Sequence, residues 1–234
     1  MSTKRTRKKR QAATENHLAV EREALLARAL VHVPFDGWTE TSLRAAAADL
    51  NYDWSMARRV FPRGVRDLIG FFDIDVDRRM VAAFDDMDLE SLRIRERIVA
   101  TVRKRLEICM PHREACGRLI AYYALPGNAV AGLRVMYRSV DLMWRAAGDT
   151  ATDFNFYSKR GLLAGVYSST ILFWLYDRSE DCADSWAFLD RRIANVMEIQ
   201  KTRGRLEQGV EALGRVLRRG PIGLRRQRAS RASG

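Results

Sequence analysis

The sequence predicts an all-α protein, on three observations. Apolar residues recur at helical spacing in one segment after another, and Pro, Gly or Asn interrupts the pattern between segments. No segment shows the period-two alternation of a β-strand, and no internal repeat is present. With 234 residues, 47% of them hydrophobic, the chain is long enough to bury a large core.

The N-terminal part is expected to hold four helices. The first runs from Leu18 to Val33 and is broken by Pro34 and Gly37, and a short second helix ends at Asn51. A brief third helix follows at about 54–61, and a longer fourth helix begins after Pro62 and Gly64 and continues to about residue 80. The N-cap candidates are Thr39 or Thr41 for the second helix and Asp53 for the third.

The remainder is also read as helical. Apolar spacing predicts helices at 92–109, from Pro111 to the break at 126–128, from there to about Gly148, at 155–177 and at 181–203. A further helix over residues 205–219 is amphipathic and basic. Its apolar face carries Leu206, Val210, Leu213 and Leu217, and its polar side includes Arg215 and Arg218. Such a helix can lie in a membrane interface, and the alternative is docking on its own protein or on a partner.

The formal net charge of +12 is concentrated at the two ends of the chain. Residues 1–17 hold six Lys or Arg and one acid, and residues 201–234 hold ten Lys or Arg and two acids, so the segment between them is close to neutral. We expect a disordered basic tail at 1–17, for which a solubilising role is the alternative. Anionic lipid surfaces and nucleic acid both attract tails of this kind.

The sequence offers few candidate catalytic or metal-binding residues. The one ligand-like cluster is Cys109-x2-His112-x3-Cys116, which lacks a fourth ligand and is better explained by two buried thiols beside a helix start. The sequence has no Glu-x-x-His pair for a di-iron site and no glycine motif that cradles phosphate. We therefore predict that the protein is not an enzyme. We expect no catalytic residue, no metal and no cofactor. No run of apolar residues is long enough to span a bilayer.

The order of the first four helices resembles the helix-turn-helix head of TetR-type bacterial repressors. The resemblance rests on Ala24 to Leu30, Gly37-Trp38-Thr39, Leu43 to Ala47 and Val60-Phe61-Pro62. It implies a head at 18–80 and a helical ligand-binding and dimerisation domain at 81–203, followed by the C-terminal segment 204–234. The head holds nine arginines against ten acids, and Trp54 follows the cap of the would-be recognition helix, so DNA binding is not favoured.

From Leu125 to Met197 the sequence resembles the coenzyme Q (ubiquinone) biosynthesis accessory protein family, the ninth Coq protein of mitochondria and its alphaproteobacterial relatives. The matching stretches include Leu125 to Asn128, Thr152 to Arg160, Leu163 to Thr170 and Trp186 to Ile193. Here Phe156 stands where the family usually has a tryptophan, and Ser168-Ser169 where relatives often carry an Asn-Thr pair.

The resemblance implies a homodimer that binds phospholipid and isoprenoid quinone precursors and presents them to the di-iron demethoxyubiquinone hydroxylase at the membrane. The lipid-binding residues so implied are Arg160, Leu163, Ala164 and Tyr167. The implied partner-binding residues are Asp153, Phe156, Tyr157 and Arg160. The implied compartment is a bacterial cytoplasm, peripheral to the inner membrane, or the mitochondrial matrix side in a eukaryote.

The small residues of the apolar helix have two interpretations. Gly161, Ala164 and Gly165 could leave room for an isoprenoid, or they could allow close packing against a neighbouring helix or a dimer mate. The rival to lipid presentation is a ligand-responsive repressor, which needs a basic recognition face. A third hypothesis, an enzyme acting on lipids, needs a catalytic constellation that the sequence does not offer.

Overall fold

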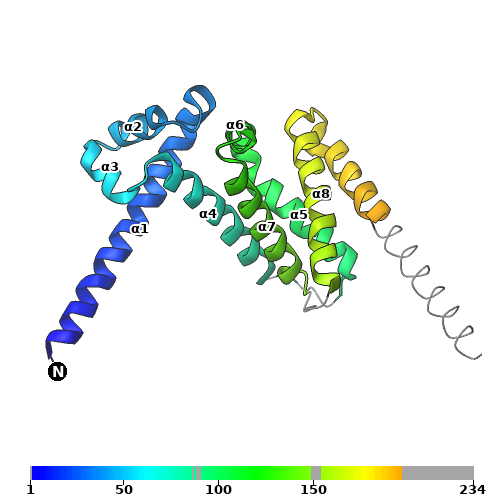
Figure 1. Cartoon of the computed structure of the whole chain (residues 1–234), viewed down its shortest axis with the longest axis horizontal. Helices are drawn as coiled ribbons and strands as arrows, with labels where there is room; N and C mark the ends of the chain where they lie inside the picture. The colour runs from blue at the N-terminus through cyan, green and yellow to red at the C-terminus, as the bar shows by residue number, and fades with distance from the viewer. Residues whose placement is uncertain (1, 86, 88–90, 149–153, 197–234) are drawn as a thin grey trace, which may run out of the picture. The chain divides into compact units, whose positions relative to one another are not determined.

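The computed structural model describes residues 2–85, 87, 91–148 and 154–196, with the backbone alone for residues 2–16 and 154–156. All regular structure in the described residues is helical (Figure 1). The helices are α1 (Ser2–Asp36), α2 (Glu40–Asp49), α3 (Trp54–Val60), α4 (Val65–Asp85), α5 (Ile94–Cys109), η1 (Met110–His112), α6 (Arg113–Ala124), α7 (Ala129–Ala146), α8 (Phe154–Tyr176) and η2 (Glu180–Cys182). Residues 183–196 are helical as well.

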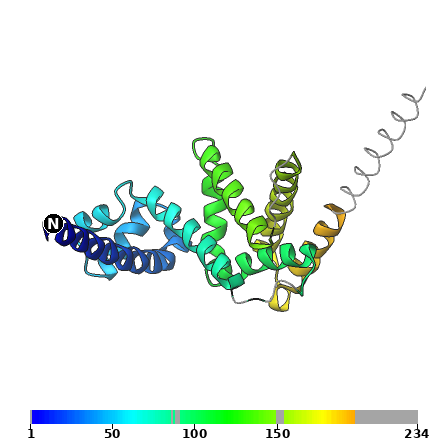
Figure 2. The ribbon, with the colours of Figure 1, turned by 90° about the horizontal axis from the view of Figure 1, so that it is seen from below.

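The chain forms two compact units, Met1–Asp190 and Arg191–Gly234. In the first unit α1 packs against α2, α3, α4 and α6, and α4 also packs against α5 and α7. Helix α4 therefore belongs both to the helix-turn-helix head and to the helices that follow, as Figures 1 and 2 show. The second unit is described for residues 191–196, which are helical.

The head has the caps and breaks that the sequence predicts. The side chain of Thr39 accepts a hydrogen bond from the backbone N–H of Ser42 at 3.4 Å, and Asp53 accepts one from Met56 at 2.7 Å. Gly37 has φ +69° and Asn51 has φ +56°, which is the left-handed conformation that ends a helix. The expectation of four helices in this order is confirmed.

Two hydrogen bonds connect the head to α6, against which α1 also packs. The indole N–H of Trp38 donates to the carbonyl of Ala115 at 2.9 Å in the buried interior. Nη2 of Arg118 donates to the carbonyl of Pro34 at 2.9 Å. The boundary expected at residue 80 therefore does not separate two compact units, because α4 and these contacts hold residues 18–80 together with the helices up to residue 190.

The first helix differs from the expectation. Residues 1–17 are predicted to be disordered, but α1 begins at Ser2. The segment contains no Gly or Pro before Pro34, so nothing in it stops a helix that is anchored further along by buried Leu25 and Leu26. Pro34 also fails to end α1, because in the last turn it removes only one backbone donor and the bond from Gly37 N–H to Val33 carbonyl still forms at 2.8 Å.

No helix in the described part of the chain is both long enough and apolar enough to cross a membrane. The predicted amphipathic helix at 205–219, with Leu206, Val210, Leu213, Leu217, Arg215 and Arg218, lies outside the described residues.

Candidate lipid-binding groove

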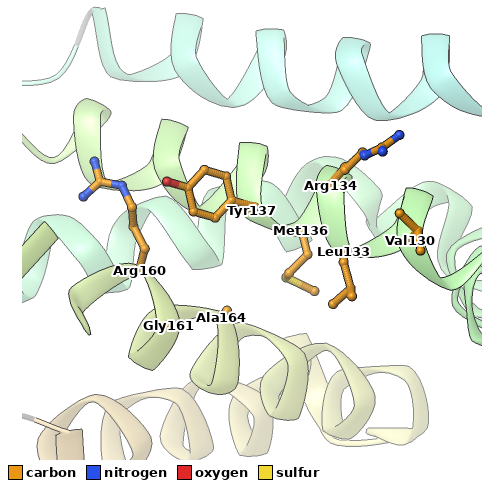
Figure 3. A pocket seen from close by; sticks show the side chains of 8 residues that line it. All are labelled: Val130, Leu133, Arg134, Met136, Tyr137, Arg160, Gly161 and Ala164. Carbon is orange, nitrogen blue, oxygen red and sulfur yellow. The ribbon is translucent and has the colours of Figure 1, made fainter. Parts of the chain in front are cut away.

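Helices α7 and α8 form the walls of an open groove of about 520 Å³ (Figure 3). Its lining residues are Val130, Leu133, Arg134, Met136 and Tyr137 from α7, and Arg160, Gly161 and Ala164 from α8. The lining is mostly apolar, with Arg160 near one end and Val130 near the other. A volume of this size and an apolar wall with few polar groups are typical of small-molecule sites.

The α7 wall consists of apolar side chains that the fold leaves in contact with solvent. Leu133 is 70% exposed, Val130 60% and Tyr137 47%. They recur at helical spacing along the N-terminal half of α7, whereas Val140 and Met143 in its C-terminal half are fully buried. The N-terminal half of α7 therefore carries apolar side chains that remain exposed. Exposed apolar residues grouped in this way indicate a binding surface.

Arg160 is held firmly at its end of the groove. Its side chain is 2% exposed, and its Nε donates to Oδ1 of Asp141 at 2.7 Å. The other oxygen of Asp141 accepts from Nε of Arg145, also at 2.7 Å. One carboxylate therefore positions two guanidinium groups, and a polar group of a ligand in the groove would meet a fixed cation at this end.

The small residues of α8 leave open space in the described part of the chain. A Cβ placed on Gly161 or Gly165 would meet no described atom within 4 Å. Close packing of these two glycines against another helix of the first unit is therefore not what the structure has. Room for a ligand and contact with a second copy of the chain are the two interpretations that stay open.

The four residues predicted to bind lipid lie on two faces of α8. Arg160 and Ala164 line the groove. Leu163 and Tyr167 are 2% and 3% exposed and face the core, where the Tyr167 hydroxyl accepts a hydrogen bond from Nη1 of Arg105. Burial raises the pKa of Tyr167 above its ordinary value. A role for Leu163 and Tyr167 in lipid binding stays a prediction.

The sequence alone does not single out the groove residues of α7. The helical spacing of Val130, Leu133 and Tyr137 indicates an apolar stripe without showing whether it is covered. Only the packing of α4 and α5 on the opposite side of α7 reveals that this stripe remains exposed.

The predicted partner segment is described only in part. Asp153 lies outside the described residues, and for Phe156 only the helical backbone is described. Tyr157, one turn before Gly161, is 67% exposed. Arg160 is the residue common to the predicted partner segment and the groove.

The sulfur-containing cluster forms no metal site in the described residues, where no group of three or more His, Cys, Asp or Glu side chains is placed to hold a metal. Cys109 closes α5 and Cys116 lies in α6, and both are free and buried, as the reading of two buried thiols predicts. A hydrogen bond between the two thiols lowers the pKa of Cys109 and raises that of Cys116.

In the head, Arg58 of the would-be recognition helix α3 and Arg44 of α2 face a carboxylate and an aromatic ring of the head itself. Arg58 lies 3.9 Å from Glu40, and Arg44 lies 4.0 Å from the same carboxylate. The guanidinium of Arg44 also stacks at 3.9 Å over the ring of Trp54. These exposed ion pairs are weak, but they reduce the net positive charge that this face offers to a phosphate.

The fold and the sequence both have known relatives. A TetR transcriptional regulator from Nitrosomonas europaea ATCC 19718 matches the structure with a TM-score of 0.63 and 20% sequence identity, covering 76% of this chain and 98% of that one. This similarity confirms the predicted TetR-like, all-α fold. A family model described as COQ9 matches residues 129–200, the segment that contains both walls of the groove.

Three mitochondrial proteins are similar to this chain in sequence. The ubiquinone biosynthesis protein COQ9 of Rattus norvegicus is 32% identical over 196 residues, which are 81% of this chain and 62% of the relative. The Homo sapiens protein of that name is 30% identical over 81% of this chain and 61% of the relative, and COQ9-B of Xenopus laevis is 29% identical over 86% and 69%. This chain thus spans about three-fifths of the length of the first two. Sequence and fold agree, and the chain belongs to the COQ9 family.

Proposed function

We propose that this chain is a non-catalytic protein of ubiquinone biosynthesis that binds phospholipid or isoprenoid quinone precursors and presents them to the demethoxyubiquinone hydroxylase at a membrane. The relatives named above carry ubiquinone biosynthesis in their names. The observation that carries the proposal is the open apolar groove between α7 and α8, with the fixed guanidinium of Arg160 at one end.

The groove suits an amphiphile. Its apolar residues offer contacts to a hydrocarbon or isoprenoid chain, which gains about 25 cal/mol for each Å² of apolar surface removed from water. The buried arginine offers a charge-assisted hydrogen bond to a headgroup oxygen. We place the lipid along α7, with its polar end at Arg160.

The remaining parts of the proposal concern assembly and location. The open face of α8 at Gly165, which does not line the groove, suits contact with a second copy of the chain, which would make the protein a homodimer. The basic C-terminal segment would hold that dimer at the membrane surface, in the bacterial cytoplasm or on the matrix side of the mitochondrial inner membrane.

The lipid is tested by native mass spectrometry of the purified full chain, followed by extraction and identification of what it carried. We expect a phospholipid or an isoprenoid quinone precursor in a fixed ratio to protein, and we expect Ala164→Trp to lose most of it because an indole fills the groove. The control is Ala48→Trp, the same change at an exposed alanine of α2. A wild-type protein without lipid, or an Ala164→Trp protein that retains it, would overturn the proposed groove.

Docking to the hydroxylase is tested with two tyrosines of α8. Tyr157 is 67% exposed beside the groove, and Tyr176 is 82% exposed at the other end of the helix. We expect Tyr157→Ala to weaken the measured affinity for the hydroxylase by about tenfold or more, since aromatic anchors dominate interfaces, and Tyr176→Ala to leave it within about twofold. Equal affinities for both variants would contradict docking through the segment of Tyr157.

A further inference from the structure

A second groove lies between α4 and α7, lined by other residues than the first, and holds about 440 Å³. Its lining residues are Ile74, Asp77, Arg78, Val81, Ala82 and Asp85 from α4, and Arg138 and Leu142 from α7. The wall is mostly apolar, and Ile74 is 52% exposed although it is a large hydrophobic residue. This volume lies within the range for small-molecule sites, about 300–1,000 Å³, and is smaller than that of the α7–α8 groove.

One side chain that lines this groove has a hydrogen-bond donor without an acceptor among the described residues. Nη2 of Arg138 is buried and has no hydrogen-bond partner among the described residues. The Nε of the same side chain donates to Oδ2 of Asp77 at 3.1 Å, which fixes the guanidinium in place. A buried donor without an acceptor costs free energy, so a site of this kind favours a ligand that brings an oxygen.

The charges around Asp77 point to an anion. Arg105 donates to Oδ1 of Asp77 at 3.0 Å and Arg138 to Oδ2, so two guanidinium groups share one carboxylate. The hydroxyl of Ser139 donates a hydrogen bond to Oδ1 of the same carboxylate at 2.9 Å. Burial raises the pKa of nearby Asp73, which favours its neutral form and weakens it as a second counter-charge. Asp77 therefore pairs with both guanidinium groups, so that one carboxylate faces two positive charges.

We propose that the α4–α7 groove binds a single-chain carboxylic acid, with the carboxylate on Nη2 of Arg138 and the chain along Ile74, Val81 and Leu142. Asp85 also lines the groove and repels an anion, which directs the carboxylate to Arg138. The site is separate from the α7–α8 groove and does not rest on the function proposed for that groove, because the two share no lining residue.

The test is calorimetric titration of the full-length chain with dodecanoate below its micelle concentration, and with dodecanol as the uncharged probe of equal chain length. We expect dodecanoate to bind about tenfold or more tightly than dodecanol, since a hydrogen bond between two charged groups contributes about that factor or more. Equal affinity for the two probes, or no binding of dodecanoate, would overturn the proposal.

Two arginine variants test whether dodecanoate binds at Arg138. Arg138→Met should weaken dodecanoate binding by about tenfold and leave dodecanol unchanged, and it should fold because Asp77 keeps Arg105 and Ser139. Arg78→Met is the matched control, because Arg78 lines the same groove but its guanidinium is 2.6 Å from Asp75. Unchanged dodecanoate affinity in a folded Arg138→Met protein, or an equal loss in Arg78→Met, would contradict the assignment.

Two blocking variants separate the grooves. Ala82→Trp fills the α4–α7 groove and should abolish binding of dodecanoate, whereas Ala164→Trp fills the α7–α8 groove and should leave it in place. The reverse pattern would place the carboxylate in the α7–α8 groove and overturn the proposal, while the lipid carried by the purified protein reports separately on the proposed function.

Discussion

At the scale of single residues, two aspartates one turn apart on α4 have opposite environments. The carboxylate of Asp77 accepts hydrogen bonds from Arg105, Arg138 and Ser139. Asp73 accepts one from the hydroxyl of Tyr123 at 2.5 Å. Burial raises the pKa of Asp73 despite the opposing effects of Tyr123, Arg105 and Arg138, while the neighbouring charge of Asp77 adds to the rise.

Asp73 should make stability depend on pH. Because the folded state holds this proton more tightly than the unfolded state, the free energy of unfolding declines as pH rises above 3.8, the ordinary value, until the pH passes the folded-state pKa. Asp73→Asn removes this titration and keeps an oxygen for Tyr123. We expect the variant to gain about 1 kcal/mol or more over wild type between about pH 4 and pH 8 in urea unfolding.

The control for this measurement is Asp36→Asn at the exposed end of α1. Its difference from wild type should stay nearly constant over the same pH range. A constant difference for Asp73→Asn as well would show that burial of Asp73 does not shift its proton affinity.

At the scale of helices, the turn between α8 and the helical residues 183–190 is organised by one side chain. Asp177 accepts hydrogen bonds from the backbone N–H and the hydroxyl of both Ser179 and Ser185. Burial alone would raise the pKa of Asp177, but these bonds outweigh it and hold the pKa well below the usual value. The carboxylate thereby caps the helix that follows, although the sequence marked it only as the end of α8.

Removing this cap should destabilise the protein. We expect Asp177→Ala to lower the free energy of unfolding by about 2 kcal/mol or more, because several charge-assisted hydrogen bonds are lost together. Amide hydrogen exchange of residues 183–190 should accelerate in the variant. Asp184→Ala, in the same helix but exposed, is the comparison, and an equal effect of both substitutions would argue against capping by Asp177.

At the scale of the whole molecule, the head and the following helices form one compact unit up to residue 190, and Trp38 is buried against α6 where they meet. Trp38→Phe keeps most of the apolar contact and loses the hydrogen bond to the carbonyl of Ala115. We expect a cost of about 1 kcal/mol in urea unfolding, with one cooperative transition retained. Trp54→Phe, on the surface of the head, should cost less; a larger effect there would contradict this role of Trp38.

Most of the fold could be predicted from local patterns, because caps such as Thr39 and Asp53 and breaks such as Gly37 act within a few residues. The site could be predicted only in part. Arg160 and Ala164 came from a family resemblance, whereas Asp77, Arg105 and Ser139 have the residue types of a solvated surface and become a buried cluster only when α4, α5 and α7 pack together. Periodicity along one helix carries no information about such pairings.

Gly132 gives α7 an unusual vulnerability to mutation. A Cβ at this position would lie 2.9 Å from Cβ of Tyr123 on α6, closer than side chains tolerate, so even alanine must push the two helices apart. Since α7 forms one wall of both grooves, such a shift would alter two binding surfaces at once. In a genetic screen for lost ligand binding, Gly132 should therefore emerge beside true contact residues, although it touches neither ligand.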